Sequence, residues 1–307
     1  MATGYGPHPQ VARVGPSAPT KGAMLSLEIL GVKVRIRCAE AETRALVTAH
    51  YRPMQRPVDT ADLTYTVARP RRTWLLARDG VAPVAASDPG ELLLLLDQDL
   101  IIQLQTLRAD LYFVHAAVLE SGGEAFMLVA ASGGGKSTTA WGLVHHGFGY
   151  LSDELAPVDL GTMTVHPYPR ALALKTLPPR SYPLPPTTLS SSRGFHVSTA
   201  GVPSGIGATA APLAAVLFLR YAPGAGGPSV ARISAAEAGA RLYVNALNAL
   251  AHPAEGLDAA IHIAGRTACF ELSTAEVTAT CALVRVTLDG LAGSRRHGRA
   301  GARSARS

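Results

Sequence analysis

The chain has 307 residues, of which 48% are hydrophobic and 16% are charged, so it is too apolar for a disordered protein and can build a packed core. Its three cysteines are widely spaced, which excludes a disulfide scaffold and a Cys-rich zinc module and is typical of a reducing compartment. The N-terminus has no signal-peptide pattern, and the apolar runs, such as residues 92–96, are far shorter than the ~20 residues of a membrane span. We therefore expect a soluble, cytoplasmic protein.

The net charge of +6 comes from the two ends of the chain. Residues 1–22 and 292–307 together hold seven basic residues and no acid, which leaves 21 basic against 22 acidic residues in the body. A nucleic-acid-binding domain usually spreads its basic residues over a folded face, so we expect no DNA partner. Composition predicts a disordered leader over 1–22 and a basic, disordered tail over 292–307.

Residues 23–108 are expected to form a small α+β module. Apolar residues alternate about Gly31, which predicts a pair of strands, and longer stretches with helical spacing follow. The expected elements are a strand pair over 25–38, strands at 63–67 and 73–77, and helices at 39–51 and 91–107. This module contains no evident catalytic cluster.

Residues 109–291 are expected to form a second domain. A strand at 112–119, the turn Ser121-Gly122-Gly123 and a strand at 125–130 predict a hairpin that leads into a glycine-rich loop. The further expected elements are a helix ending at 146, a strand at 149–152, a hairpin turning at 159–162, a long Pro/Ser-rich loop over 176–212, a strand at 213–220, a helix at 234–251 and a last element at 283–291. This order of elements predicts an α/β protein with a mixed sheet.

The glycine-rich loop carries the strongest chemical signal. Glycines let backbone amides converge on phosphate oxygens, and the following helix N-terminus adds unpaired N–H groups and partial positive charge. In this Walker A-like arrangement Lys136 reaches the β- and γ-phosphates and Ser137 binds Mg²⁺, although Ala130 stands where the motif has its first glycine. The alternative is a glycine-rich turn with a chance Lys-Ser pair. The residues expected to bind phosphate are Ser132, Gly133, Gly134, Gly135, Lys136, Ser137 and Thr138.

An acidic pair, Asp153 and Glu154, follows the predicted strand at 149–152. We expect this strand to run parallel to the one before the loop, so that Asp153 lies at the sheet edge where the helix begins and faces the γ-phosphate. Glu154 is expected to point to the other side. The candidate metal ligands are therefore Ser137, Asp153 and Glu154, and the alternative is a surface turn with two solvated acids.

His115 lies in the predicted strand at 112–119, beside the strand that leads into the loop. Its apolar neighbours suggest a half-buried side chain. A lone strand histidine is often a core residue with one hydrogen bond, so that interpretation stays open beside a role at the site.

These segments together resemble the catalytic core of the HPr kinase/phosphorylase family, and more closely its shorter bacterial relatives, the HPr-kinase-related serine kinases. The resemblance covers residues 111–175. The segments that carry it are Phe113-Val114-His115, residues 131–137, His146-Gly147, residues 150–154 and, more loosely, His166-Pro167-Tyr168-Pro169-Arg170 with Lys175.

The resemblance implies a P-loop nucleotide-binding core of the HPr kinase type that uses ATP and Mg²⁺. It implies that Lys136 and Ser137 hold phosphate and metal, and that Asp153 takes the proton of a substrate serine with His115 nearby to orient or polarise it. The acidic pair is Asp-Glu where the parent family has Asp-Asp, and residues 176–291 do not match the parent's C-terminal signature. Some short relatives are encoded beside ribosomal peptide clusters and phosphorylate a lasso-peptide precursor, so the expected acceptor is a protein or peptide serine. The parent family is often hexameric, which leaves a homo-oligomer open.

Three functions remain open on the sequence. The first is an ATP-dependent serine kinase in which Arg170 steadies the transferring phosphoryl group; alternatively Arg170 only pairs with a surface acid, and Lys175 has the same two interpretations. The second is a nucleotide-dependent ATPase or switch, and the third is a non-catalytic nucleotide-binding scaffold. A serine hydrolase built on Ser132 is excluded, because the glycine two positions earlier in a nucleophile elbow is absent.

Overall fold

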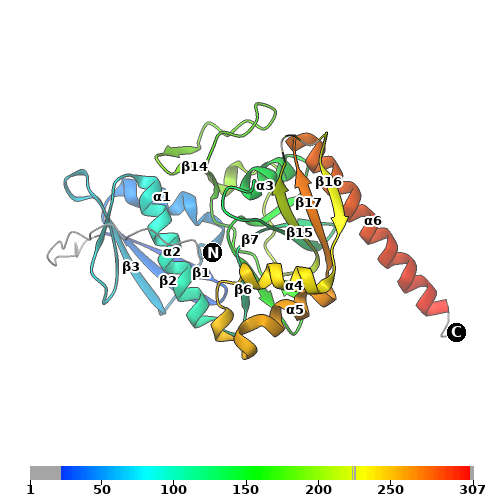
Figure 1. Ribbon diagram of the computed structural model, residues 1–307. Coiled ribbons are helices and arrows are strands. Elements are labelled where there is room, and N and C mark those ends of the chain that lie inside the picture. The colour runs from blue at the N-terminus through cyan, green and yellow to red at the C-terminus, as the bar shows by residue number, and fades with distance from the viewer. Residues whose placement is uncertain (1–21, 223, 225, 305–307) are drawn as a thin grey trace, which may run out of the picture.

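The computed structural model describes residues 22–222, 224 and 226–304, with side chains as far as Ser294. Of the predicted leader, residues 1–21 lie outside the described residues. Figure 1 shows an N-terminal half with its own sheet beside a larger second half, from which the C-terminal helix projects.

The N-terminal half is a five-stranded sheet with two helices packed on its buried face. Neighbouring strands are antiparallel except for β2 and β3, which are parallel. In sheet order the strands are β1 (Ala23–Ile29), β2 (Val32–Cys38), β3 (Leu63–Ala68), β4 (Trp74–Arg78) and β5 (Val84–Ala86), and the helices are α1 (Ala41–His50) and α2 (Pro89–Leu107). The predicted strands and helices of this module are confirmed, and β5 is additional, since three residues are too few to show a periodicity.

The second half is built on a nine-stranded mixed sheet. Its main path runs β6-β10-β11-β15-β8-β7-β9. Strand β17 pairs with β15 on the side opposite β8, and β16 pairs with β17. The strands are β6 (Tyr112–Val114), β7 (Ala116–Ser121), β8 (Glu124–Val129), β9 (Gly149–Ser152), β10 (Ala156–Asp159), β11 (Thr164–Val165), β15 (Ala211–Tyr221), β16 (Ser229–Arg232) and β17 (Ala268–Thr274). The central strand β15 is parallel to both β8 and β17, so the predicted mixed sheet is confirmed.

Two pairs of helices cover the two faces of this sheet. They are α3 (Lys136–His145) with α6 (Val277–Ser304), and α4 (Ala235–Val244) with α5 (Leu257–Arg266). Trp141 of α3 and Cys281 of α6 share a core with Leu128 of β8. The neighbouring β8 residue Met127 packs instead with Leu242 and Ile263 from α4 and α5. Successive residues of β8 thus point to opposite faces, as the pleat requires.

The segment predicted as one long loop, 176–212, is partly ordered into strands. A third sheet is formed by β12 (Leu172–Leu174), β14 (Gly194–Val197) and β13 (Leu189–Ser191), in that order. Strands β13 and β14 lack an alternating apolar pattern of useful length. Only their pairing identifies them, β14 with β12 on one side and with β13 on the other.

Several other helices and strands differ from the prediction. Helix α4 ends at Val244 rather than 251, because the chain turns at Asn245 and continues in short 3₁₀ segments. Helix α5 and strand β17 were not predicted. Helix α6 begins at Val277 and its backbone stays helical to Ser304, where a disordered tail was expected from 292; Ala and Arg, which recur in this segment, are good helix formers. The 3₁₀ helices are Arg52–Met54, Pro70–Arg72, Thr199–Gly201, Ala249–Ala251 and Pro253–Gly256.

The two halves share one hydrophobic core. Phe113, Leu155 and Tyr168 of the second half are buried in the same cluster as Leu96 and Leu100 of α2. The chain therefore passes near residue 109 from one sheet to the next within this shared cluster, and the two other clusters lie in the second half alone. Within the described residues, no helix combines the length and apolar character needed to cross a bilayer.

Candidate active site

The glycine-rich loop connects β8 to α3, as predicted, and its glycines are required by the backbone. Gly133 and Gly135 have φ values of +84° and +86°, a region that favours glycine. At Gly134 an added Cβ would lie 3.0 Å from the Cβ of Ala130 and 3.1 Å from the carbonyl oxygen of Ala131. A side chain at 134 would therefore fit only if the loop shifted by a few tenths of an ångström, away from both Ala130, which replaces the first glycine of the motif, and the Ala131 carbonyl oxygen.

Lys136, Ser137 and Thr138 form the first turn of α3, where helix N–H groups lack intrahelical partners. Lys136 is only 8% exposed, and its Nζ has no hydrogen-bond partner among the described residues. Burial lowers the pKa of this amino group, although the carboxylates of Glu154 and Asp153 act to raise it. A buried amino group without a partner is costly, so this position is suited to an anion supplied from outside the chain.

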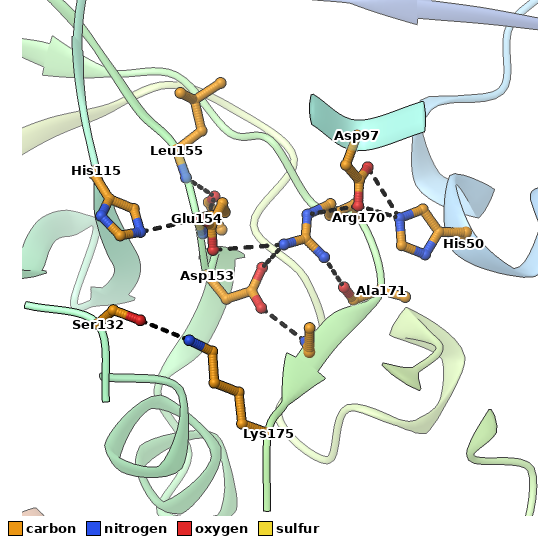
Figure 2. Close-up of polar contacts among 12 residues, drawn as sticks. His50, Asp97, His115, Ser132, Asp153, Glu154, Leu155, Arg170, Ala171 and Lys175 are labelled. Carbon is orange, nitrogen blue, oxygen red and sulfur yellow. Dashed lines mark hydrogen bonds and ion pairs between the residues drawn. The ribbon is translucent and has the colours of Figure 1, made fainter. Parts of the chain in front are cut away.

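The acidic pair lies at the sheet edge predicted from the sequence. Strands β8 and β9 are each antiparallel to β7 and so run parallel to one another with β7 between them. Asp153 directly follows β9, which brings it to the edge where β8 ends and α3 begins. Figure 2 shows both carboxylates between His115 on one side and Arg170 on the other.

Asp153 is buried, and each of its carboxylate oxygens accepts a hydrogen bond. Tyr150 Oη donates to Oδ1 at 3.1 Å, and the backbone N–H of Ala173 donates to Oδ2 at 2.7 Å. Arg170 Nη2 lies 3.4 Å from Oδ1. Burial raises the pKa of this carboxyl above its ordinary value despite the nearby guanidinium. A raised pKa makes Asp153 the stronger base of the pair.

Glu154 is more open, with 40% of its side chain exposed. Its Oε1 lies 3.0 Å from His115 Nε2, and its Oε2 lies 3.7 Å from Arg170 Nη2. Partial burial would raise its pKa, but the hydrogen bond from His115 and the charges of Lys136 and Arg170 lower it to about 2. Neighbouring carboxyls with pKa values displaced in opposite directions are typical of sites that divide two chemical roles between them.

His115 lies at a break between two strands, and the single strand predicted over 112–119 is wrong at this residue. Its backbone N–H donates to Asn245 O at 2.8 Å, so β6 ends before it and β7 starts after it. The half-buried imidazole contacts the carboxylate of Glu154 instead of a core group. The interpretation of His115 as an ordinary core histidine therefore does not fit its environment.

Arg170 is buried. The alternative interpretation, in which Arg170 only pairs with a surface acid, does not describe its surroundings. Its Nη1 donates to Ala171 O at 2.9 Å, and its guanidinium is within ion-pair distance of Asp97, Asp153 and Glu154. Burial opposes its charge, but Asp153 and Asp97 hold the pKa of Arg170 well above its ordinary value. Lys175 lies nearer the loop, where its Nζ donates to Ser132 Oγ at 2.7 Å.

Two residues from the N-terminal half complete this network and were not identified from the sequence. Asp97 on α2 lies 3.4 Å from Arg170 Nε, and His50 at the end of α1 contacts both oxygens of Asp97 at 3.1 and 2.9 Å. A signal was present, because Asp97 interrupts an apolar run on the buried stripe of a predicted helix. An acid at such a position needs a buried partner.

The residues present fit ATP and Mg²⁺. Lys136 and the amides of the loop suit a polyphosphate, and Ser137, Asp153 and Glu154 provide the hydroxyl and carboxylate oxygens that Mg²⁺ takes together with phosphate. Among the described residues no cluster of three or more His, Cys, Asp and Glu side chains could hold a metal by protein ligands alone.

Comparisons with known proteins add no relative. Neither the scan against protein-family models nor the search of curated proteins returned a match to this chain.

Proposed function

We propose that this protein is an ATP-dependent kinase of the HPr kinase type, with a P-loop core, which transfers the γ-phosphate of ATP to a serine hydroxyl of a protein or peptide. The observation that carries the proposal is the buried, unpartnered Nζ of Lys136, at the start of α3 and electrostatically coupled to both carboxylates of the acidic pair. The resemblance of residues 111–175 to HPr-kinase-related serine kinases supports the same conclusion.

Phosphate binding would be divided between backbone and side chains. The backbone amides of the loop and of the first turn of α3 would donate to the β- and γ-phosphates, except that of Gly134, which already donates to Ala131 O, and Lys136 would supply a positive charge. Mg²⁺ held by Ser137 and an acidic side chain would neutralise the triphosphate charge that develops on transfer. Lys175 donates to Ser132 Oγ and so stabilises the loop, and its ammonium group would add a second positive charge beside the bound phosphates.

The acidic pair would perform the proton transfer and hold the metal. Asp153, with its raised pKa, accepts the proton of the serine hydroxyl as the hydroxyl oxygen attacks the γ-phosphorus and the bond to the β-phosphate oxygen breaks. Glu154, with a pKa of about 2, stays ionised and is suited to the metal, while His115 fixes its orientation. Arg170 holds both carboxylates in place.

One observation favours a second candidate, a nucleotide-dependent ATPase or switch. Asp153 is almost completely buried and both its oxygens already accept hydrogen bonds, so an acceptor hydroxyl must displace or share one of them. A protein that hydrolyses ATP to move a partner has to admit only a water molecule at this position, which is smaller than a peptide serine.

Incubation with γ-labelled ATP, Mg²⁺ and serine-containing peptides distinguishes these functions. Label on a peptide serine supports the kinase, and release of free phosphate without labelled peptide supports the ATPase. If Mg-ATP binds but is neither transferred nor hydrolysed, the non-catalytic nucleotide-binding scaffold is favoured, and if calorimetry detects no Mg-ATP binding the scaffold has lost nucleotide binding as well. Lys136→Met is the negative control, and Lys33→Met, a lysine on β2 in the N-terminal sheet, is the matched substitution away from the site.

A further inference from the structure

The second half of the protein does not hold its buried arginine by itself. Arg170 precedes β12, and the two carboxylates that it contacts with Nη2 follow β9 in the same half. The Nε side of the guanidinium instead faces Asp97, which belongs to the middle of α2 in the N-terminal half. Figure 2 shows Arg170 between the acidic pair and the Asp97–His50 pair.

Asp97 is fixed in turn by residues of its own half. His50 Nε2 contacts both carboxylate oxygens, and Tyr51 Oη donates to Oδ1 at 2.5 Å. All three side chains are buried. Burial opposes the charge of Asp97, but Arg170 and His50 lower its pKa to about 2, so it is ionised throughout the physiological range.

The N-terminal half also holds the backbone beside Arg170. The N–H of Ala171 donates to His50 O at 2.8 Å, and Arg170 Nη1 donates to Ala171 O. His50 of α1 therefore constrains Arg170 in two ways. Its side chain holds Asp97, and its carbonyl oxygen accepts a hydrogen bond from the backbone next to Arg170. Nη1 and the adjoining backbone are thus hydrogen-bonded, and Nε faces the Asp97 carboxylate at 3.4 Å as an ion pair without a hydrogen bond to any described residue. In this orientation Nη2 is directed toward the acidic pair.

We propose that the N-terminal half is a positioning element of the active site, in which Asp97, held by His50 and Tyr51, sets the place of Arg170 and through it the geometry of Asp153 and Glu154. None of these three residues touches the reacting atoms, so they are positioning residues. The inference rests on the proposed kinase function only for its kinetic consequence.

The test compares two aspartates on the same helix. Asp97→Asn removes the charge that faces Arg170, whereas Asp99→Asn removes an ion pair with Arg78 and a hydrogen bond from Tyr65 inside the N-terminal half. We expect Asp97→Asn to lower kcat by ~10- to 100-fold while KM for ATP changes by no more than about twofold. Asp99→Asn should leave both parameters near their wild-type values.

A second measurement does not depend on catalysis. The ¹³C carboxyl resonances of Asp153 and Glu154 should move in Asp97→Asn and stay in place in Asp99→Asn. If the two variants lower kcat equally, or if Asp97→Asn leaves the Asp153 resonance unchanged, the positioning role is refuted. If wild-type protein transfers no phosphate yet the resonances move as expected, the kinase proposal fails and the positioning role stands.

Tyr51→Phe serves where Asp97→Asn does not fold. It removes one hydrogen bond to Asp97 and leaves the ion pair with Arg170. We expect it to move the Asp153 resonance in the same direction by a smaller amount, and an unmoved resonance would again refute the inference.

Discussion

Nε2 of His115 lies 3.0 Å from Oε1 of Glu154, and this contact brings together a strand break and a turn that are 39 positions apart in the chain. Together with Lys136 and Arg170 it keeps the Glu154 carboxyl ionised, whereas burial raises the pKa of Asp153 next to it. The pKa values of two consecutive acids are thus displaced in opposite directions by their surroundings.

This difference predicts the pH dependence of stability. Glu154 has a folded-state pKa of about 2 against an ordinary value of 4.5, so below pH 4.5 the unfolded chain binds the proton more readily. Its contribution to the free energy of unfolding is therefore fully present above pH 4.5 and is lost as the pH falls toward 2. The contribution of Asp153 has the opposite sign, because the pKa of its carboxyl is raised in the folded state. This contribution is fully present below the ordinary pKa of an aspartate and is lost as the pH rises through the folded-state pKa.

Urea unfolding of Glu154→Gln between pH 2 and 7 measures the first effect. We expect its stability to fall less steeply below pH 4.5 than that of the wild type, since Gln does not titrate. Glu28→Gln, at an exposed position on β1, is the matched control and should follow the wild-type curve. Parallel curves for Glu154→Gln and wild type would contradict the lowered pKa.

Lys136→Met should separate stability from nucleotide binding. Methionine keeps the apolar stem of the side chain and removes a buried amino group without a partner, so we expect unchanged stability or a gain of about 1 kcal/mol without nucleotide. The rise in Tm that Mg-ATP gives the wild type should disappear. A thermal-shift assay with and without Mg-ATP checks both, and a variant that keeps the full nucleotide shift would remove Lys136 from the phosphate site.

Asp153→Asn and Glu154→Gln should lose activity in different ways. Without a base, Asp153→Asn should bind Mg-ATP as the wild type does and lose ~10²- to 10⁴-fold in turnover. Glu154→Gln should need more Mg²⁺ for half-maximal rate, because a neutral amide is a weaker ligand than a carboxylate. Rates measured over a Mg²⁺ series distinguish the two, and the reverse pattern would exchange the roles of the two acids.

The part of the site that is local in sequence could be predicted, because short-range chemistry determines it. The strand–loop–helix around Gly135 and the placement of Asp153 at the same edge follow from glycine conformation and from the rule that parallel strands share their carboxyl edge. The burial of Arg170 could not be predicted. It depends on Asp97, 73 positions earlier, and an isolated sequence does not show which helix will cover which loop.

The fold was predicted where apolar periodicity was strong and missed where it was weak. Strands β1 and β2 alternate cleanly and were placed correctly. Strands β13 and β14 have only three and four residues, too few to show a periodicity, and are identified by their pairing in the sheet β12-β14-β13. Helix α5 was missed although its buried positions have helical spacing, because Ala fills several of them and gives a weak apolar signal.

The contact between Ala130 and Gly134 predicts how the altered first position of the loop is tolerated. In Gly134→Ala the new Cβ would meet the Ala130 Cβ at 3.0 Å and the Ala131 carbonyl oxygen at 3.1 Å, so the loop must shift by a few tenths of an ångström. We expect a loss of ~1–3 kcal/mol in the free energy of unfolding and weaker Mg-ATP binding.

The double variant Ala130→Gly/Gly134→Ala should recover part of this loss, because one of the two close contacts disappears while the contact with the carbonyl oxygen remains. Gly265→Ala, in α5 with open space around its Cβ position, is the matched control and should stabilise the protein by ~0.5–1 kcal/mol. Urea unfolding of the wild type, Ala130→Gly, Gly134→Ala and the double variant closes the cycle. If the two loop substitutions prove strictly additive, Ala130 does not determine the need for glycine at 134, and the tolerance of alanine at the first position has another cause.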